Sequence, residues 1–452
     1  MKVLKVSSAG VRGIVGAGMS AEVAMAFAQA FATYLEGGII VLARDSRPSG
    51  VMMRSAVLSG LLASGCRVID LGVCPSPSVR NLMELLKADG GIIIAAGHNP
   101  QPWNALKFLA SDGSYLTALQ GQELLEIYHH AEFRSAGWEQ IQPLERDDSA
   151  ATRHIETLKS RFDCQAIARR KFKVAIDCCN GTCSTLTPRL LEEIGCEVVV
   201  LNDDIRRPFP RYPNPTPDNM NQLESLSKAA RADIGFAHDA EGERLGLVTE
   251  EGKALHQEYT FALSTAVKMA ASEVRGPVVT SLSTSWMAEK IAEARGVAVH
   301  RVPIGPAHVT AKALQLKACV AGEGSGSVIL PDLQRGPDGI AAIMLILEHL
   351  AKTGQSLTEL VGTVPRFHMI KENISLPTNL LYRKLQRFRT EAERQYPNLE
   401  LNLLDGVRLT GTDGWIHVRA SSTESILRVI TEAVTQEVAQ ELHSFAQGQI
   451  LE

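Results

Sequence analysis

The sequence of 452 residues lacks three features that are typical of membrane, secreted and nucleic-acid-binding proteins. Its longest uninterrupted apolar run, 340–347, ends at Glu348 and is too short to cross a bilayer. Residues 1–13 show no signal-peptide layout, so we expect a cytoplasmic protein with no membrane partner. No block of like charge occurs and the formal net charge is −4, which argues against a nucleic-acid partner.

The eight cysteines also lack the pattern of a metal site or a disulfide framework. They include no C-x-x-C pair. Cys178, Cys179 and Cys183 cluster, but no histidine lies nearby in the sequence to complete a set of metal ligands. We therefore expect reduced and mostly buried thiols.

The chain has no low-complexity segment and no clear Gly/Ser-rich linker, although it is too long for one hydrophobic core. Hydrophobic residues make up 45% and charged residues 21%, which is ordinary for globular protein and excludes wholesale disorder. At roughly 100–200 residues per domain, this length predicts two to four domains.

Short apolar runs alternate with amphipathic, helix-length segments through most of the chain. The predicted strands fall in three groups: 39–43, 68–71 and 91–96; 173–177, 197–201 and 233–237; 277–281, 298–302 and 319–323. Predicted helices between them include 49–63, 76–87, 184–194 and 220–230. Such alternation predicts parallel sheets flanked by helices, here as three related α/β units.

The last part of the chain has a different pattern. It predicts five short strands and two helices, at 367–375, 401–404, 407–410, 415–420 and 426–432, and at 379–395 and 436–447. This order is typical of an α+β domain. We predict three α/β domains with mixed or parallel sheets and a C-terminal α+β domain, with ranges 1–149, 150–253, 254–365 and 366–452.

A polar loop at 95–100 directly follows a buried strand. Asn99-Pro100 stops the strand and sets a turn, which places His98 at its carboxyl end, where open α/β sheets bind ligands. Lys107 follows on the next extended segment. A histidine and a lysine there suit phosphate binding or proton transfer. A turn with a structural histidine explains the pattern equally well.

The segment 239–244 follows the predicted strand 233–237. Asp239, Glu241 and Glu243 point the same way if this loop is extended, and clustered carboxylates suit a hard cation such as Mg²⁺. Taken alone, the pattern fits a solvated acidic turn better.

Glycines alternate with polar residues at 322–327. They allow close approach of the backbone to a ligand, and Glu323 and Ser325 could bond sugar hydroxyls. The segment is not a P-loop, because no Gly-Lys-Ser/Thr follows at the required spacing. A bare glycine-rich turn remains open.

The segment 419–428 places hydroxyl groups between two arginines. Guanidinium groups, hydroxyls and backbone amides together suit a phosphate. For a neutral-to-acidic chain, this segment is the best single pointer to a phosphate ligand.

Six segments, in this order, resemble motifs of the α-D-phosphohexomutase family, which includes phosphomannomutase, phosphoglucomutase and phosphoglucosamine mutase. They are 8–13 (family T-S-G-I-R-G), 44–47 (R-D-T-R), 95–100 (T-A-S-H-N-P), 239–244 (D-G-D-A-D-R), 322–327 (G-E-x-S-G-H) and 419–428 (R-x-S-x-T-E-P-x-x-R). Lys107 and Asp338-Gly339 also match family positions. The resemblance covers nearly the whole chain.

The resemblance implies a heart-shaped, four-domain molecule with a central cleft. It implies reversible movement of a phosphoryl group between the 1- and 6-positions of a hexose, through a phosphoserine, Mg²⁺ and a hexose 1,6-bisphosphate. The implied site residues are Gly97, His98, Lys107, Arg12 and Arg244 for catalysis; Asp239, Glu241 and Glu243 for the metal; Glu323 and Ser325 for the sugar; and Arg419, Ser421, Ser422, Thr423 and Arg428 for the phosphate.

The chain departs from the family at the chemistry itself. Gly97 occupies the serine position and has no oxygen to carry a phosphoryl group. Glu241 and Glu243 replace shorter aspartates, so we expect a weakened Mg²⁺ site. Further replacements are Ala95 for threonine, Ser327 for histidine and Ser425 for proline.

Three hypotheses follow. The first is a protein that binds a hexose or hexosamine phosphate with impaired or no phosphoryl transfer, in a regulatory role or as a partner of itself or of an active mutase paralogue. The second is an active phosphohexomutase, an isomerase, that uses a non-serine route such as His98 as phosphoryl carrier. The third is a scaffold without a ligand, against which the retained arginines and the Glu323/Ser325 pair argue.

Overall fold

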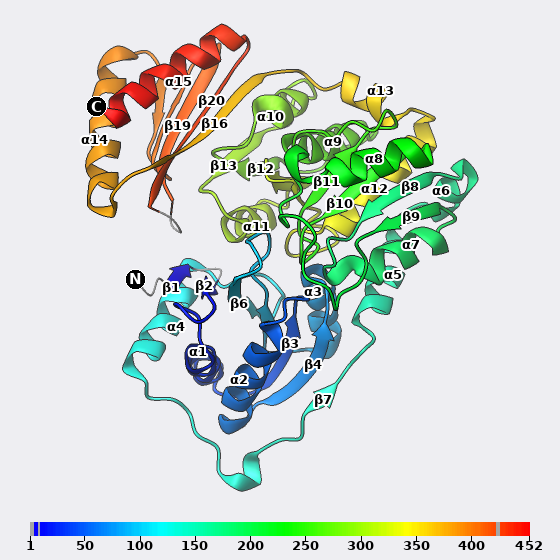
Figure 1. Ribbon diagram of the computed structural model, residues 1–452, viewed down its shortest axis with the longest axis vertical. Coiled ribbons are helices and arrows are strands. Elements are labelled where there is room, and N and C mark those ends of the chain that lie inside the picture. The colour runs from blue at the N-terminus through cyan, green and yellow to red at the C-terminus, as the bar shows by residue number, and fades with distance from the viewer. Residues whose placement is uncertain (1–3, 8–9, 422–424) are drawn as a thin grey trace.

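The computed structural model describes residues 4–7, 10–421 and 425–452, and it folds them around four sheets (Figure 1). We call the parts built on these sheets domains I to IV, in chain order. The predicted fold class is confirmed: three α/β domains are followed by an α+β domain. The implied central cleft, and the residue at which each domain ends, stay predictions.

Domain I, blue to cyan in Figure 1, is built on a seven-stranded mixed sheet of order β1-β2-β6-β5-β3-β4-β7. Its elements are β1 (Leu4–Ser7), β2 (Gly10–Ile14), α1 (Ala21–Tyr34), β3 (Ile39–Arg44), α2 (Gly50–Ala63), β4 (Arg67–Val73), α3 (Ser76–Leu86), β5 (Gly90–Ile94), β6 (Trp103–Ala110), α4 (Ala118–His130) and β7 (Glu145–Arg146). Strand β3 is apolar on both faces because helices cover both. Ile40 and Leu42 pack in the cluster with α1 and α2, whereas Val41 and Ala43 pack in the cluster with α3.

Domains II and III each contain a four-stranded sheet, of order β11-β10-β8-β9 and β13-β12-β14-β15. Domain II and the helix before it contain α5 (Ala150–Arg161), α6 (Cys164–Arg170), β8 (Lys173–Asp177), α7 (Leu186–Glu193), β9 (Glu197–Leu201), α8 (Asn221–Ala230), β10 (Ile234–His238) and β11 (Leu245–Val248). Domain III contains α9 (Glu258–Met269), β12 (Val278–Ser281), α10 (Trp286–Glu293), β13 (Val299–Val302), α11 (Pro306–Gln315), β14 (Val320–Glu323), β15 (Ser327–Ile329), α12 (Gly339–Thr353) and α13 (Leu357–Gly362).

The sheets of domains I to III are parallel at their centres and antiparallel where β6, β11 and β15 pair. The apolar run 340–347 forms the buried part of α12 and belongs to one continuous core shared by domains II and III. No helix among the described residues is long and apolar enough to cross a membrane.

The cysteine prediction is confirmed: all eight are free, and six are buried. Burial raises the pKa of the Cys179 and Cys196 thiols to about 12. Such thiols are weakly ionised and therefore inert.

Domain IV, orange to red in Figure 1, has a five-stranded antiparallel sheet of order β16-β20-β19-β18-β17. Its elements are β16 (His368–Ser375), α14 (Thr378–Gln395), β17 (Glu400–Asn402), β18 (Val407–Thr410), β19 (Gly414–Ala420), β20 (Ile426–Ala433) and α15 (Gln436–Leu451). It meets domain III through a buried polar network. Glu432 accepts hydrogen bonds from the Trp286 amide (2.7 Å), the Trp415 indole (2.8 Å) and the Ser285 hydroxyl.

His417 belongs to the same interface. Its Nδ1 lies 2.8 Å from Ser283 Oγ of domain III, and its Nε2 lies 2.6 Å from the carbonyl oxygen of Asp405. Burial, together with the charge of Arg408, lowers the pKa of His417 to about 4, and the bond to the Asp405 carbonyl opposes the shift. The ring is therefore neutral at pH 7.

We expect the chain to lose stability in mild acid through His417. The unfolded histidine binds its proton near pH 6.5 and the folded one near pH 4, so the contribution is complete above about pH 6.5 and is lost as the pH falls towards 4. Between about pH 7.5 and about pH 5 the loss is about 2 kcal/mol, because about pH 5 lies about 1.5 units below the unfolded pKa and each unit corresponds to about 1.4 kcal/mol. Calorimetric unfolding at about pH 7.5 and about pH 5 measures it. His417→Gln should shrink the difference between the two pH values, and the exposed His130→Gln should leave it unchanged.

Candidate active site

Arg47 holds the turn that carries Gly97 and His98. This buried guanidinium donates to the carbonyl oxygens of Gly97 (2.9 Å), Asn99 (2.7 Å) and Pro100 (2.6 Å). Asp45 holds it in turn, with its Oδ2 2.9 Å from Arg47 Nε. The segment 44–47 therefore shapes the turn at the carboxyl end of β5.

Gly97 adopts a left-handed backbone conformation, with φ +57°. A Cβ placed on it would lie 2.5 Å from Glu241 Oε1, far inside van der Waals contact. The carboxylate of Glu241 thus fills the space that a side chain at position 97 would need. The glycine and the longer acidic side chain fit each other across the boundary between domains I and II.

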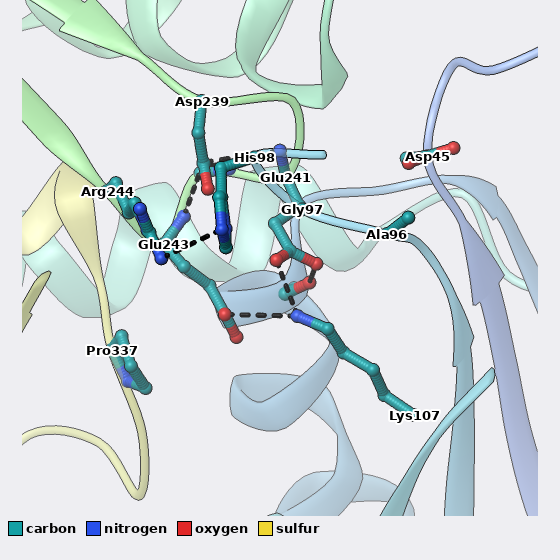
Figure 2. A network of polar contacts seen from close by, with 12 residues as sticks. Asp45, Ala96, Gly97, His98, Lys107, Asp239, Glu241, Glu243, Arg244 and Pro337 are labelled. Atoms are coloured by element: carbon teal, nitrogen blue, oxygen red, sulfur yellow. Dashed lines mark hydrogen bonds and ion pairs between the residues drawn. The ribbon is translucent and has the colours of Figure 1, made fainter. Parts of the chain in front are cut away.

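Asp239 shapes the acidic loop between β10 and β11. Its Oδ1 accepts hydrogen bonds from the backbone amides of Glu241 (3.3 Å), Gly242 (2.8 Å) and Glu243 (3.0 Å). It points into its own loop, whereas Glu241 and Glu243 reach towards domain I (Figure 2).

Lys107 of β6 lies between the two glutamates. Its Nζ is 2.5 Å from Glu241 Oε1 and 3.1 Å from Glu243 Oε2 (Figure 2). The second oxygen of Glu241 accepts from Ser76 Oγ at 3.0 Å. Glu243 Oε1 accepts from the Tyr115 hydroxyl at 2.6 Å and pairs with Arg80. Both glutamates are therefore fully engaged by groups of domain I.

Electrostatics tie this cluster together. Burial, and after it the charge of Glu243, raise the pKa of Glu241 to about 8, although the charge of Lys107 opposes the rise. Burial also acts to raise the pKa of Glu243, but the charges of Lys107 and Arg80 outweigh it and hold that pKa well below the usual range. Burial acts to lower the pKa of Lys107, yet the two carboxylates raise it.

These contacts do not fit the Mg²⁺ site that the resemblance implies. Across the described residues, which exclude 1–3, 8–9 and 422–424, no group of three or more His, Cys, Asp or Glu side chains is arranged to hold a metal ion. Mg²⁺ needs near-octahedral oxygen ligands at about 2.0–2.1 Å. At 239–243 the carboxylate oxygens instead accept hydrogen bonds from protein donors.

His98 contacts one cation and feels the charges of three others. Its Nε2 is 3.5 Å from an Arg244 guanidinium nitrogen, and the ring is partly exposed. Its pKa lies well below the usual value, chiefly because of burial and then because of the charges of Arg244, Arg12, Lys107 and Arg428. The predicted catalytic residues of domains I and II, and the predicted phosphate residue Arg428 of domain IV, thus act on one neutral imidazole.

The predicted sugar and phosphate residues lie on domains III and IV. Glu323 Oε1 accepts from the Gly305 amide at 3.1 Å; burial raises the pKa of Glu323, and the nearby charges of Arg244 and Arg419 oppose the rise. Arg419 Nε donates to Asp405 Oδ1 at 3.1 Å. Three further predicted residues are partly exposed: Ser325, Ser421 and Arg428. Ser422 and Thr423 lie outside the described residues.

Sequence reasoning missed the partners that hold the acidic loop. Arg80, Tyr115 and Ser76 bind its glutamates, and Asn214 Oδ1 accepts from Arg244 at 2.8 Å. One signal was present for Arg80, because α3 buries Val79, Leu82 and Met83 and so carries this arginine on a largely buried helix. The sequence did not show which carboxylate it would meet.

A second polar chain resembles a catalytic triad but is sealed from solvent. Ser78 Oγ lies 2.9 Å from His154 Nδ1, and His154 Nε2 lies 3.0 Å from Asp338 Oδ2. The His154 and Asp338 side chains are each 1% exposed, so no substrate reaches them. Asp338 Oδ1 also caps α12 through the amides of Ile340 and Ala341. This chain joins domain I, α5 and domain III.

Comparison with known proteins agrees with this architecture. Family models for phosphoglucomutase/phosphomannomutase α/β/α domains I, II and III match residues 4–135, 152–252 and 257–367, and the model for the C-terminal domain matches 384–446. A phosphoglucomutase/phosphomannomutase of Thermococcus kodakarensis is 34% identical over 438 residues, covering 96% of this chain and 95% of that protein. A protein of Methanopyrus kandleri named "Probable phosphoglucosamine mutase" is 33% identical over 439 residues, with 96% and 95% covered.

A solved structure shows the same arrangement of domains. The crystal structure of a phosphoglucomutase/phosphomannomutase family protein from Burkholderia thailandensis superposes with a TM-score of 0.85 at 26% identity, covering 98% of this chain and 97% of that one. The same family is indicated by the domain models along the chain, by relatives above 30% identity and by this full-length superposition. The chain therefore belongs to the phosphoglucomutase/phosphomannomutase family, the α-D-phosphohexomutases.

Proposed function

We propose that this chain binds a hexose or hexosamine phosphate where its domains meet, and that it does not transfer the phosphoryl group through residue 97. The names of its relatives, phosphoglucomutase/phosphomannomutase and phosphoglucosamine mutase, support the ligand class. The cations around His98 support an anionic ligand, because opposite charge in a partly buried site attracts phosphate.

The observation that carries the second half of the proposal is the packing above Gly97. Glycine offers no nucleophilic oxygen, and Glu241 Oε1 fills the space beside it. A serine there would need the Glu241 carboxylate to move away from Lys107. The packing at position 97 therefore requires a glycine. This supports a regulatory or partner role, with impaired or absent phosphoryl transfer.

One observation favours a second candidate, an active mutase that uses a non-serine route. His98 is neutral and partly exposed, and a neutral imidazole can act as a nucleophile towards a phosphoryl group. In this case a hexose 1,6-bisphosphate would hand one phosphoryl group to His98. Turnover that disappears in His98→Ala would support this route, and turnover that survives would remove His98 from it.

Arg419→Ala should weaken sugar phosphate binding about 10–100-fold, because a charge-assisted hydrogen bond contributes about 1.5–3 kcal/mol. Titration calorimetry with glucosamine 6-phosphate and mannose 1-phosphate measures the affinity. Arg206→Ala is the matched control, since that guanidinium is 86% exposed and pairs only locally with Asp204. Failure of both sugar phosphates to bind the folded wild-type chain would contradict the proposal.

A further inference from the structure

We propose that the Lys107 ammonium is the resident cation of the acidic loop 239–244 and takes the place of a divalent metal ion there. The proposal concerns the charges of this chain itself. It stands whether or not a sugar phosphate binds, because its test measures the metal directly.

The first argument is the use of the carboxylate oxygens. Five oxygens of the loop accept hydrogen bonds: Asp239 Oδ1, both oxygens of Glu241 and both oxygens of Glu243. A divalent ion would have to displace several of these donors at once. The ammonium already contacts one oxygen of each glutamate, at 2.5 and 3.1 Å, and so bridges them as a metal ion would.

The second argument is charge. The loop contributes at most three negative charges, from Asp239, Glu241 and Glu243, because the pKa of Glu241 is raised to about 8. Lys107 and Arg80 contact the glutamates directly, and the charge of Arg244 acts on Asp239, so three positive charges already balance the carboxylates of the loop. A divalent ion would add an uncompensated charge of +2 to a buried site, which is costly in a low dielectric.

The third argument is reach. Glu241 and Glu243 start from domain II, whereas Lys107 and Arg80 belong to domain I. The additional methylene of glutamate, relative to aspartate, lets these carboxylates extend towards the cations of domain I. Gly97 leaves the space that Glu241 needs on the way, since a Cβ there would lie 2.5 Å from Glu241 Oε1. The contact of Lys107 with the two glutamates therefore depends on the length of the glutamate side chains and on the glycine at position 97.

The test is a titration of the full chain with Mn²⁺, read by the electron paramagnetic resonance signal of the free ion. We expect no stoichiometric site up to about 1 mM Mn²⁺, which would place any dissociation constant above about 1 mM. We also expect Mg²⁺ and EDTA to leave the melting temperature unchanged. A site that persists in Glu241→Gln and in Glu243→Gln lies elsewhere and agrees with the proposal.

One result would overturn the proposal: a single Mn²⁺ site per chain that is lost in Glu241→Gln or Glu243→Gln. If these variants do not fold, crystals of the wild-type chain grown with Mn²⁺ decide the question. An anomalous peak between Glu241 and Glu243 in place of the ammonium would reject the internal cation. Density for the Lys107 side chain between the two carboxylates would support it.

Discussion

Lys107→Met lowers the free energy of unfolding by about 3–5 kcal/mol, the cost of leaving buried charges without a partner. Lys107 is only 16% exposed and contacts two glutamates that are 4% and 8% exposed. Methionine keeps the apolar stem but removes the charge. Urea unfolding of the two proteins measures the difference. Lys159→Met is the control: its pair with Glu193 is exposed, so its loss costs at most about 1 kcal/mol.

A second substitution distinguishes lost charge from lost packing. The double variant Lys107→Met/Glu241→Gln also replaces the carboxylate that lost its partner by a neutral amide. We therefore expect it to regain part of the stability that Lys107→Met loses. The two sites are in contact, so their effects should couple rather than add. A Lys107→Met loss no larger than that of Lys159→Met would contradict the buried ion-pair cluster.

Gly97→Ala is the second large effect, with an expected loss of about 3 kcal/mol or more. The left-handed backbone accounts for about 1–2 kcal/mol of it. The rest comes from the new Cβ, which must push Glu241 Oε1 out of a 2.5 Å contact and away from Lys107. Gly296→Ala isolates the backbone component, because Gly296 has φ +67° and nothing within 4 Å of an added Cβ.

The contact itself is measured by a double-mutant cycle. Gly97→Ala should cost less in a Glu241→Ala background, with a coupling of about 1–3 kcal/mol. Equal losses in Gly97→Ala and Gly296→Ala would mean that the glycine is required only by its backbone. The paired change at positions 97 and 241 would then have no packing basis.

The regular elements could be predicted because their signals are local. The runs 173–177 and 197–201 match β8 and β9 residue for residue, since a short apolar run between helical segments has few alternative interpretations. The antiparallel strands at the sheet edges were harder to predict. Strand β15 has only three residues, Ser327–Ile329, too few to show a period.

The site could be predicted in its members but not in its contacts. The resemblance selected Gly97, Lys107 and Glu241, and the fold brings these three together. Their arrangement depends on how domain II docks on domain I, which no spacing in the sequence encodes. For the same reason Asp239, expected among the metal ligands, binds its own loop, and Arg80 was not anticipated.

The proposal that this chain binds a sugar phosphate without transferring the phosphoryl group is tested most directly by a coupled mutase assay on the wild-type chain. Glucose 1-, mannose 1- and glucosamine 6-phosphate are offered, each with Mg²⁺ and the matching 1,6-bisphosphate, beside an Arg244→Ala control. We predict binding by calorimetry without turnover above that control. Turnover well above the control would contradict this prediction and move the search to another phosphoryl carrier, with His98 first.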